Sequence, residues 1–239
     1  MEKEKDKADI ISSIIFTLMI GITPIITFVI SWIIGIDVGY FGIIPRNIDG
    51  IRGIITGPLV HGSLNHLFSN LPPLLFSIFL IRYFYKKQFA LIFIANYLLT
   101  GVMVWCFARD VSHIGISGVV YALISFIFWT GIFVRNKTSI ILALLVLMVY
   151  SGMFSGILPL PEMIEKNISW ESHLLGGLVG ILVAWWQKDT IKETLSIQST
   201  PRTYTTEEPR QPYLPPDTFD KTKWERYLDE QKSKFDPFQ

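Results

Sequence analysis

The segment 111–134, VSHIGISGVVYALISFIFWTGIFV, contains no Asp, Glu, Lys or Arg, and most of its polar residues gather in its first part. Spanning the hydrocarbon core of a bilayer takes roughly 17–25 apolar residues in a helix, so this segment predicts a transmembrane helix. Five further segments lack charged residues in the same way: 10–36, 53–81, 88–108, 138–161 and 172–187. The last is short, but Trp170, Trp185 and Trp186 flank it as interfacial anchors do. The sequence therefore predicts an all-α membrane protein with six transmembrane helices.

The charged residues divide the chain into three parts. Residues 1–9 form a short N-terminal segment, 10–187 hold the six predicted helices, and 188–239 form a polar tail. Much of 196–217 is expected to be disordered, because it is polar and contains many prolines. The stretch 218–235 predicts a helix that is surface-lying or marginal, with partner docking as the alternative. Its apolar residues on one side are Trp224, Tyr227 and Leu228.

The distribution of lysine and arginine predicts the orientation of the chain in the membrane. One set of predicted loops and ends holds Lys3, Lys5, Lys7, Arg82, Lys86, Lys87, Arg135, Lys137, Lys188 and Lys192. The opposite loops hold Arg46, Arg52, Arg109 and Lys166. Because lysine and arginine favour the cytoplasmic side, both termini are predicted to be cytoplasmic. The first helix is interpreted as an uncleaved anchor, and the short six-helix form indicates a bacterial plasma (inner) membrane.

Two external segments carry structural predictions. Residues 37–60 form a long external loop between the first two helices and are too apolar for a solvated linker, so they are expected to pack on the helices. The outer end of the fifth predicted helix contains Gly152, Gly156, Pro159 and Pro161. This composition predicts a frayed, mobile external end.

Four polar residues fall near the same end of their predicted helices, and they are His66, Asn70, Ser117 and His173. Polar side chains at membrane depth are costly and are usually kept for function or for an internal hydrogen bond. His66 and Asn70 have an i, i+4 spacing, which places them on one helix face. With the N terminus inside, the second, fourth and sixth helices all run inward, so the four side chains are predicted to meet below the external surface. His113 is expected in a wet loop nearby.

These residue types suit acyl transfer. A serine hydroxyl becomes a good nucleophile when a neutral histidine removes its proton, and imidazole and amide N–H groups can stabilise the oxyanion that forms. Ser117 lies in the run Gly115-Ile116-Ser117-Gly118, where glycine lets backbone and substrate approach closely. Such chemistry implies no metal or other cofactor, and water is the second substrate. A neutral base is required, so activity is expected to fall when His173 is protonated.

Three motifs, in this order on the matching helices, resemble the rhomboid family of intramembrane serine proteases. They are His61-x4-His66-x3-Asn70, Gly115-x-Ser117-Gly118 and His173-x2-Gly176-x3-Gly180. The resemblance covers roughly 10–187 and implies a rhomboid-like bundle that cleaves transmembrane segments of other, single-span membrane proteins. Substrates would enter between the second and fifth helices. The pattern departs at Arg52, which follows Ile51 where many bacterial members have a Trp-Arg pair.

The resemblance also implies a role for each motif residue. Ser117 is the nucleophile and His173 the general base, in a dyad without an acid. His66 and Asn70 would donate hydrogen bonds to the oxyanion, together with the backbone N–H of Ser117. Among the supporting residues, Tyr121 would pack on the base, and Gly176 and Gly180 would bring two helices close. His61 would stabilise the external loop, and Gly115 and Gly118 flank the nucleophile.

Other interpretations of the same residues stay open. Ser117 could be a helix-packing serine, and His173 could form an ordinary interhelical hydrogen bond. Competing functions are a catalytically inactive rhomboid relative that binds membrane proteins and a histidine-relay transporter. A zinc protease motif H-E-x-x-H is absent, and the soluble hydrolase motif G-x-S-x-G fails at Val119. The net charge of +1 comes with no basic array that would indicate nucleic acid, and the oligomeric state stays open.

Overall fold

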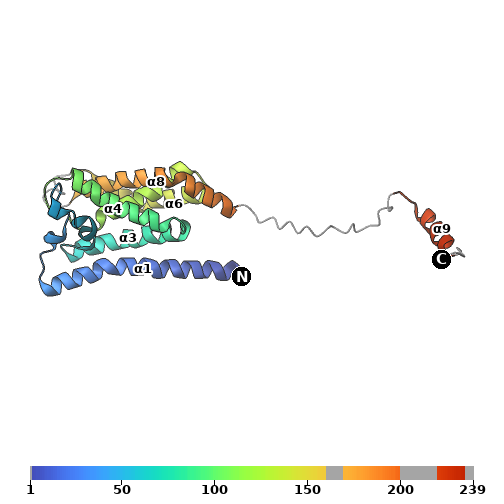
Figure 1. Ribbon diagram of the computed structural model, residues 1–239, viewed down its shortest axis with the longest axis horizontal. Helices are drawn as coiled ribbons and strands as arrows, with labels where there is room; N and C mark the ends of the chain where they lie inside the picture. Colours follow the sequence, from blue (N-terminus) through green and yellow to red (C-terminus); the bar gives the residue numbers. More distant parts are fainter. Residues whose placement is uncertain (1, 160–168, 200–219, 235–239) are drawn as a thin grey trace. The chain divides into compact units, whose positions relative to one another are not determined.

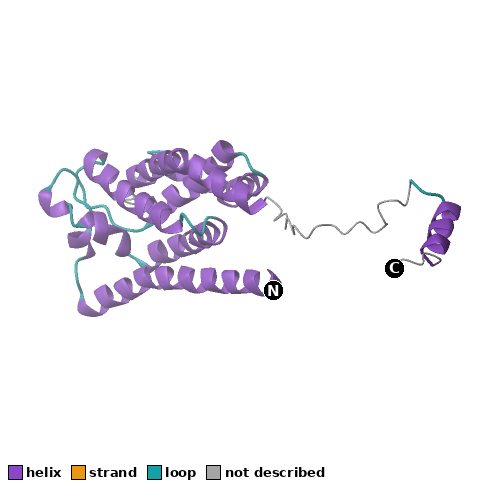
Figure 2. Cartoon of the chain, turned by 45° about the vertical axis from the view of Figure 1, so that its right-hand side comes forward, coloured by secondary structure: helices purple, strands orange, loops and turns teal. Residues whose placement is uncertain are grey.

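The computed structural model describes residues 2–159, 169–199 and 220–234. These parts of the chain are helical (Figure 2), and their β-type pairing is limited to an isolated bridge between Ile43 and His113. The long helices are α1 (Glu2–Ile34), α3 (Leu64–Phe84), α4 (Phe89–Phe107), α5 (Ser117–Val134), α6 (Lys137–Tyr150) and α8 (Trp170–Ser199). By length and composition, α1, α3, α4 and α5 can cross a membrane. The predicted all-α membrane fold is therefore confirmed, whereas the count of six spans stays a prediction.

Local backbone chemistry sets where α3 begins. The uncharged residues before it form two short helices, α2 (Gly53–Thr56) and the 3-10 turn η3 (Gly57–Leu59). Ser63 then caps α3, because its hydroxyl accepts a hydrogen bond from the His66 N–H at 3.2 Å. This cap places the His66 side chain in the first turn of the helix, at the end where α5 also begins.

Two helices end away from the limits of their uncharged segments. α6 stops at Tyr150, and the chain continues as the 3-10 helix η4 (Ser151–Ile157). α8 continues beyond residue 187 as far as Ser199, so the first residues of the polar tail extend this helix. The predicted mobile end of the fifth span lies partly outside the described residues.

α5 is the central helix of the bundle and packs against α3, α4, α6 and α8. Of its apolar window 61% is buried, compared with 22% for α1, which runs beside α3 (Figure 1). The most extensive contact joins α5 and α8. A Cβ on Gly176 would lie 2.1 Å from the carbonyl oxygen of Gly118, and one on Gly180 would lie 2.3 Å from that of Ala122. Small residues thus let the two backbones touch, as they often do between membrane helices.

The segment between α1 and α3 packs on α4 and its following loop. It begins with the 3-10 turns η1 (Val38–Phe41) and η2 (Ile48–Gly50). The Arg46 N–H donates to the carbonyl of Trp105 at 3.0 Å, and the Trp105 indole N–H donates to the carbonyl of Asn47 at 2.9 Å. The Arg52 guanidinium carbon lies 3.6 Å from the centroid of a tyrosine ring in η1, as in a cation–π contact.

The second compact unit of the chain contains α9 (Lys223–Lys234). Thr222 and Glu225 form a capping box, in which the Glu225 carboxylate accepts from the Thr222 N–H at 2.7 Å and the Thr222 hydroxyl accepts from the Glu225 N–H at 3.3 Å. The predicted helix is therefore present, with its apolar residues exposed: Trp224, Tyr227 and Leu228. The predicted disorder over 196–217 falls on helical residues up to Ser199 and otherwise outside the described residues.

Two adjacent glycines on α8 offer a matched test of its contact with α5. Gly176→Ala places a methyl group against backbone and should lower the free energy of unfolding by about 1–3 kcal/mol, the usual cost of overpacking. A Cβ on Gly177 would meet nothing within 4 Å, so Gly177→Ala should not lower stability. Thermal unfolding in detergent, followed by circular dichroism, compares the two variants. Equal melting temperatures would contradict the close backbone contact.

Candidate active site

A glycine turn places Ser117 at the first position of α5. Gly115 has a φ of +98°, in the left-handed region that favours glycine. A Cβ on Gly115 would also lie 2.5 Å from Cε1 of the His66 ring. The missing side chain therefore allows both the turn and the close approach of the imidazole to the start of α5.

Ser117 and His173 are joined by a hydrogen bond across the α5–α8 contact. The Ser117 Oγ lies 2.8 Å from Nε2 of His173, and each residue is 8% exposed. The other ring nitrogen, Nδ1, lies 2.9 Å from the carbonyl oxygen of Gly156. Because a carbonyl can only accept, Nδ1 carries the proton. In the neutral ring Nε2 is then the acceptor, so the Ser117 hydroxyl donates its proton toward the imidazole.

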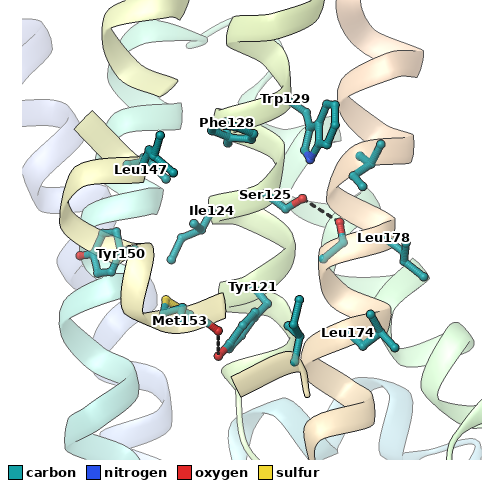
Figure 3. Close-up of a pocket in the computed structure, with 14 residues that line it drawn as sticks. Tyr121, Ile124, Ser125, Phe128, Trp129, Leu147, Tyr150, Met153, Leu174 and Leu178 are labelled. Atoms are coloured by element: carbon teal, nitrogen blue, oxygen red, sulfur yellow. Dashed lines mark hydrogen bonds between the residues drawn. The ribbon is translucent and has the colours of Figure 1, made fainter. Parts of the chain in front are cut away.

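Tyr121 packs on the same imidazole from one helical turn further along α5. Its ring stacks on His173 with centroids 4.3 Å apart and planes 8° from parallel. Its hydroxyl donates to the carbonyl of Met153 in η4 at 2.8 Å, as Figure 3 shows. A Cβ on Gly156 would lie 2.0 Å from that hydroxyl. The turn η4 therefore fits closely over the tyrosine and the histidine.

His66 and Asn70 lie one turn apart on α3. The Asn70 side-chain nitrogen donates to the His66 carbonyl at 2.8 Å, and Asn70 is 7% exposed. His61 meets the His66 ring edge-on, with centroids 5.0 Å apart. Nε2 of His61 accepts from the Ile116 N–H at 3.4 Å, so His61 ties the segment before α3 to the residue preceding Ser117.

A single cavity of about 790 Å³ brings the predicted residues together. Its lining includes His66, Asn70, Ser117, Tyr121 and His173. Further residues with hydroxyl or amide side chains also line this cavity: Ser63, Asn65, Ser69, Ser112 and Ser169. Three independent helices, α3, α5 and α8, thus place these polar side chains on one cavity, and the arrangement of a histidine-bonded serine beside N–H donors can support acyl transfer.

The wet-loop expectation for His113 is wrong, since this residue is only 3% exposed. Its Nε2 donates to the carbonyl of Arg109 at 2.9 Å, and its Nδ1 accepts from the hydroxyl of Ser169 at 2.5 Å. The backbone of His113 also pairs with that of Ile43, and each N–H donates to the other's carbonyl at 2.9 Å. Nothing in the local composition signals this burial, because the covering segments are distant in sequence.

Two groups of the site escaped sequence reasoning, and both are backbone carbonyls. Gly156 supplies the acceptor for His173, and Met153 supplies the acceptor for Tyr121. A main-chain oxygen leaves no residue type to recognise. Gly156 itself is visible in the sequence, but the glycines and prolines around it predict a flexible helix end as readily as a close fit.

The ionisation of His61 predicts a pH dependence of stability. Burial lowers the pKa of His61 from 6.5 to about 4. The folded state favours the neutral ring, so its contribution is complete above pH 6.5 and is lost as the pH falls toward 4. At 1.36 kcal/mol per pKa unit, the loss reaches about 3 kcal/mol.

The free energy of unfolding at pH 7 and pH 4.5 measures this effect. The control is His61→Gln, whose amide oxygen can still accept from the Ile116 N–H but does not titrate. The variant should show the smaller decline. An equal decline in both proteins would mean that another group is responsible.

Sequence comparisons agree with the motif pattern. The family model described as Rhomboid domain matches residues 49–188. Uncharacterized proteins of Mycobacterium bovis and Mycobacterium tuberculosis are each 31% identical over 181 residues, which is 70% of this chain and 75% of the relative. One of Mycobacterium leprae is 30% identical over 151 residues, 57% of this chain and 56% of the relative. Members of this family are generally intramembrane serine proteases. The chain is an integral membrane protein that belongs to the rhomboid family.

Proposed function

We propose that this protein is an intramembrane serine endopeptidase that cleaves transmembrane segments of other membrane proteins. The observation that carries the proposal is the 2.8 Å hydrogen bond between the Ser117 hydroxyl and Nε2 of His173. A serine that only packs needs no imidazole acceptor, and a histidine that only links two helices needs no second partner to fix its tautomer. Ser117 has such an acceptor and His173 has such a partner. Both residues line a cavity with room for a peptide segment.

The reaction follows from the two hydrogen bonds of His173. Ser117 Oγ attacks the scissile carbonyl carbon while Nε2 takes the hydroxyl proton. The same Nε2–H then protonates the leaving amine, the C–N bond breaks, and an acyl-enzyme remains. Water attacks the ester carbonyl carbon while Nε2 takes one of its protons, and Nε2–H then returns that proton to Ser117 Oγ as the C–Oγ bond breaks. The new carboxyl end leaves, and the serine hydroxyl and the neutral imidazole are restored. The Gly156 carbonyl holds the ring in place throughout and favours the positive charge it carries in between.

The oxyanion would be stabilised from α3 and from the start of α5. Asn70 has two amide protons, of which one goes to the His66 carbonyl. The second can point into the cavity beside the His66 ring, which lines the same space. Ser117 contributes its own N–H at a helix N terminus, where the backbone dipoles favour negative charge.

The surroundings proposed for this reaction are those of a bacterial plasma membrane. The mycobacterial relatives support a bacterial setting, and the lysine and arginine distribution supports cytoplasmic termini and six spans. Single-span substrates would enter between α3 and α6, where the rings of Phe76 and Tyr150 lie 5.6 Å apart and would have to separate.

Active-site labelling separates the protease from an inactive binder or a transporter. A fluorophosphonate probe should label the detergent-solubilised wild type but not Ser117→Ala, and His173→Ala should slow labelling by at least about 10³-fold because the base is lost. The control is Ser125→Ala, which removes another hydroxyl of α5. The Ser125 hydroxyl donates to the carbonyl of Gly177 and not to a histidine. Cleavage of a single-span model substrate should likewise be lost in Ser117→Ala, slowed in His173→Ala and retained in Ser125→Ala. No labelling of a folded wild type would refute the proposal.

The oxyanion role of Asn70 has a close control within the chain. Asn96 on α4 makes the same i−4 hydrogen bond as Asn70, to the Ile92 carbonyl at 2.8 Å, and is fully buried. Asn70→Ala should lower kcat on the order of 10²-fold with little change in KM. Asn96→Ala should change melting temperature but leave the kcat of the folded fraction near wild type. Similar kcat values for both variants would assign Asn70 a packing role only.

A further inference from the structure

A second histidine–serine array lies outside the proposed dyad, at the start of α8. His113 accepts from Ser169 at 2.5 Å, and the Ser169 and Ser172 hydroxyls lie 2.6 Å apart. Nε2 of His113 must donate to the Arg109 carbonyl, so Nδ1 accepts the single proton of Ser169. Ser172 must then donate to Ser169.

This array sits directly beside the dyad. Ser172 precedes His173, and a Cβ on Gly118 would lie 3.0 Å from the Ser172 carbonyl oxygen and 3.3 Å from its Cβ. The first turn of α8 is therefore in contact with the residue that follows Ser117. Any tilt or slide of this turn would move the imidazole relative to the serine hydroxyl.

The loop that carries His113 is itself held in place. His113 pairs through both backbone groups with Ile43. A neighbouring ion pair joins the same loop to the same turn of α8, because Nε of Arg109 lies 3.1 Å from the carboxylate of Glu171, which is 8% exposed. The hydrogen bonds of the array thus connect α8 to an anchored element and not to a free loop.

We propose that His113 is a positioning residue, which through Ser169 and Ser172 fixes the first turn of α8 and so holds His173 at hydrogen-bond distance from Ser117. The inference rests on the proposed function for its catalytic consequence, but the clamp itself is a structural property. It requires an acceptor at Nδ1 of His113, which only the neutral ring provides.

The surroundings of His113 keep that acceptor available. Burial lowers the pKa of His113, and the positive charges of Arg109 and Arg46 act in the same direction. The hydrogen bond to the Arg109 carbonyl and the negative charge of Glu171 act in the opposite direction and raise the pKa of His113.

Two replacements of His113 separate the hydrogen bond from packing. His113→Asn keeps an amide oxygen near the place of Nδ1, so it can still accept from Ser169. His113→Gln reaches toward the Arg109 carbonyl at the place of Nε2 and loses the acceptor for Ser169. Ser169→Ala removes the donor itself, and Asp110→Asn changes an exposed residue of the same loop as a control.

Hydrogen–deuterium exchange of the first turn of α8 tests the clamp, and the rate of fluorophosphonate labelling tests its effect on the dyad. His113→Gln and Ser169→Ala should speed exchange in this turn and slow labelling by about 10- to 100-fold, since small misplacements of catalytic groups cost this much. His113→Asn should keep both values much closer to wild type.

Each alternative result is decisive. Equal effects of His113→Asn and His113→Gln would reduce His113 to a packing residue and overturn the proposal, as would wild-type exchange and labelling in Ser169→Ala. If wild type itself resists the probe, the proposed function fails, while the exchange comparison still decides whether the clamp exists.

Discussion

The close backbone contact between α5 and α8 is the constraint on which the site depends. This contact brings the start of α5 beside the first turns of α8, where Ser117 and His173 share their hydrogen bond. Gly176 and Gly180 meet the carbonyl oxygens of Gly118 and Ala122, where any Cβ would collide. The site is thus built at the point of tightest packing, where helix positions are least free to vary.

Within that frame, the orientation of His173 comes from a backbone carbonyl and not from a carboxylate. A carboxylate in this position would be a charge held at membrane depth, and such charges are costly there. The Gly156 carbonyl fixes the same tautomer as an acidic partner would, at no cost in buried charge. The Gly156 carbonyl lies on η4, a short 3-10 helix, so the imidazole ring needs further support. Tyr121 provides it by stacking on the imidazole and bonding to η4 at the Met153 carbonyl.

The sequence was sufficient to predict the helical membrane fold and to single out the residues that share the cavity. This worked because charge-free segments mark the long helices, and because polar residues such as Ser117 and His173 stand out within them. The starts and ends of helices were less predictable, since hydropathy does not register a capping serine at position 63 or a left-handed glycine at 115. The burial of His113 could not be foreseen, because it depends on a strand-like pairing with Ile43, 70 positions earlier in the chain. The catalytic roles themselves remain predictions that geometry supports.

Tyr121, Tyr150 and Met153 lie between two neighbouring cavities whose linings differ. The cavity that contains Ser117 is lined by many hydroxyl and amide groups, whereas a second one of about 260 Å³, between α5, α6, η4 and α8, is lined almost entirely by apolar side chains (Figure 3). Water occupies cavities that offer it polar partners and avoids those that do not.

The hydroxyls that line the second cavity offer water little. Ser125 is bonded to the Gly177 carbonyl, and Tyr121 to that of Met153. The change from mixed to apolar lining therefore falls at the residues that the two cavities share, of which Tyr121 lies four residues, or about 6 Å, along α5 from Ser117. In a hydrolase within lipid, this boundary would let water reach the acyl-enzyme while the adjacent face of the bundle stays compatible with acyl chains.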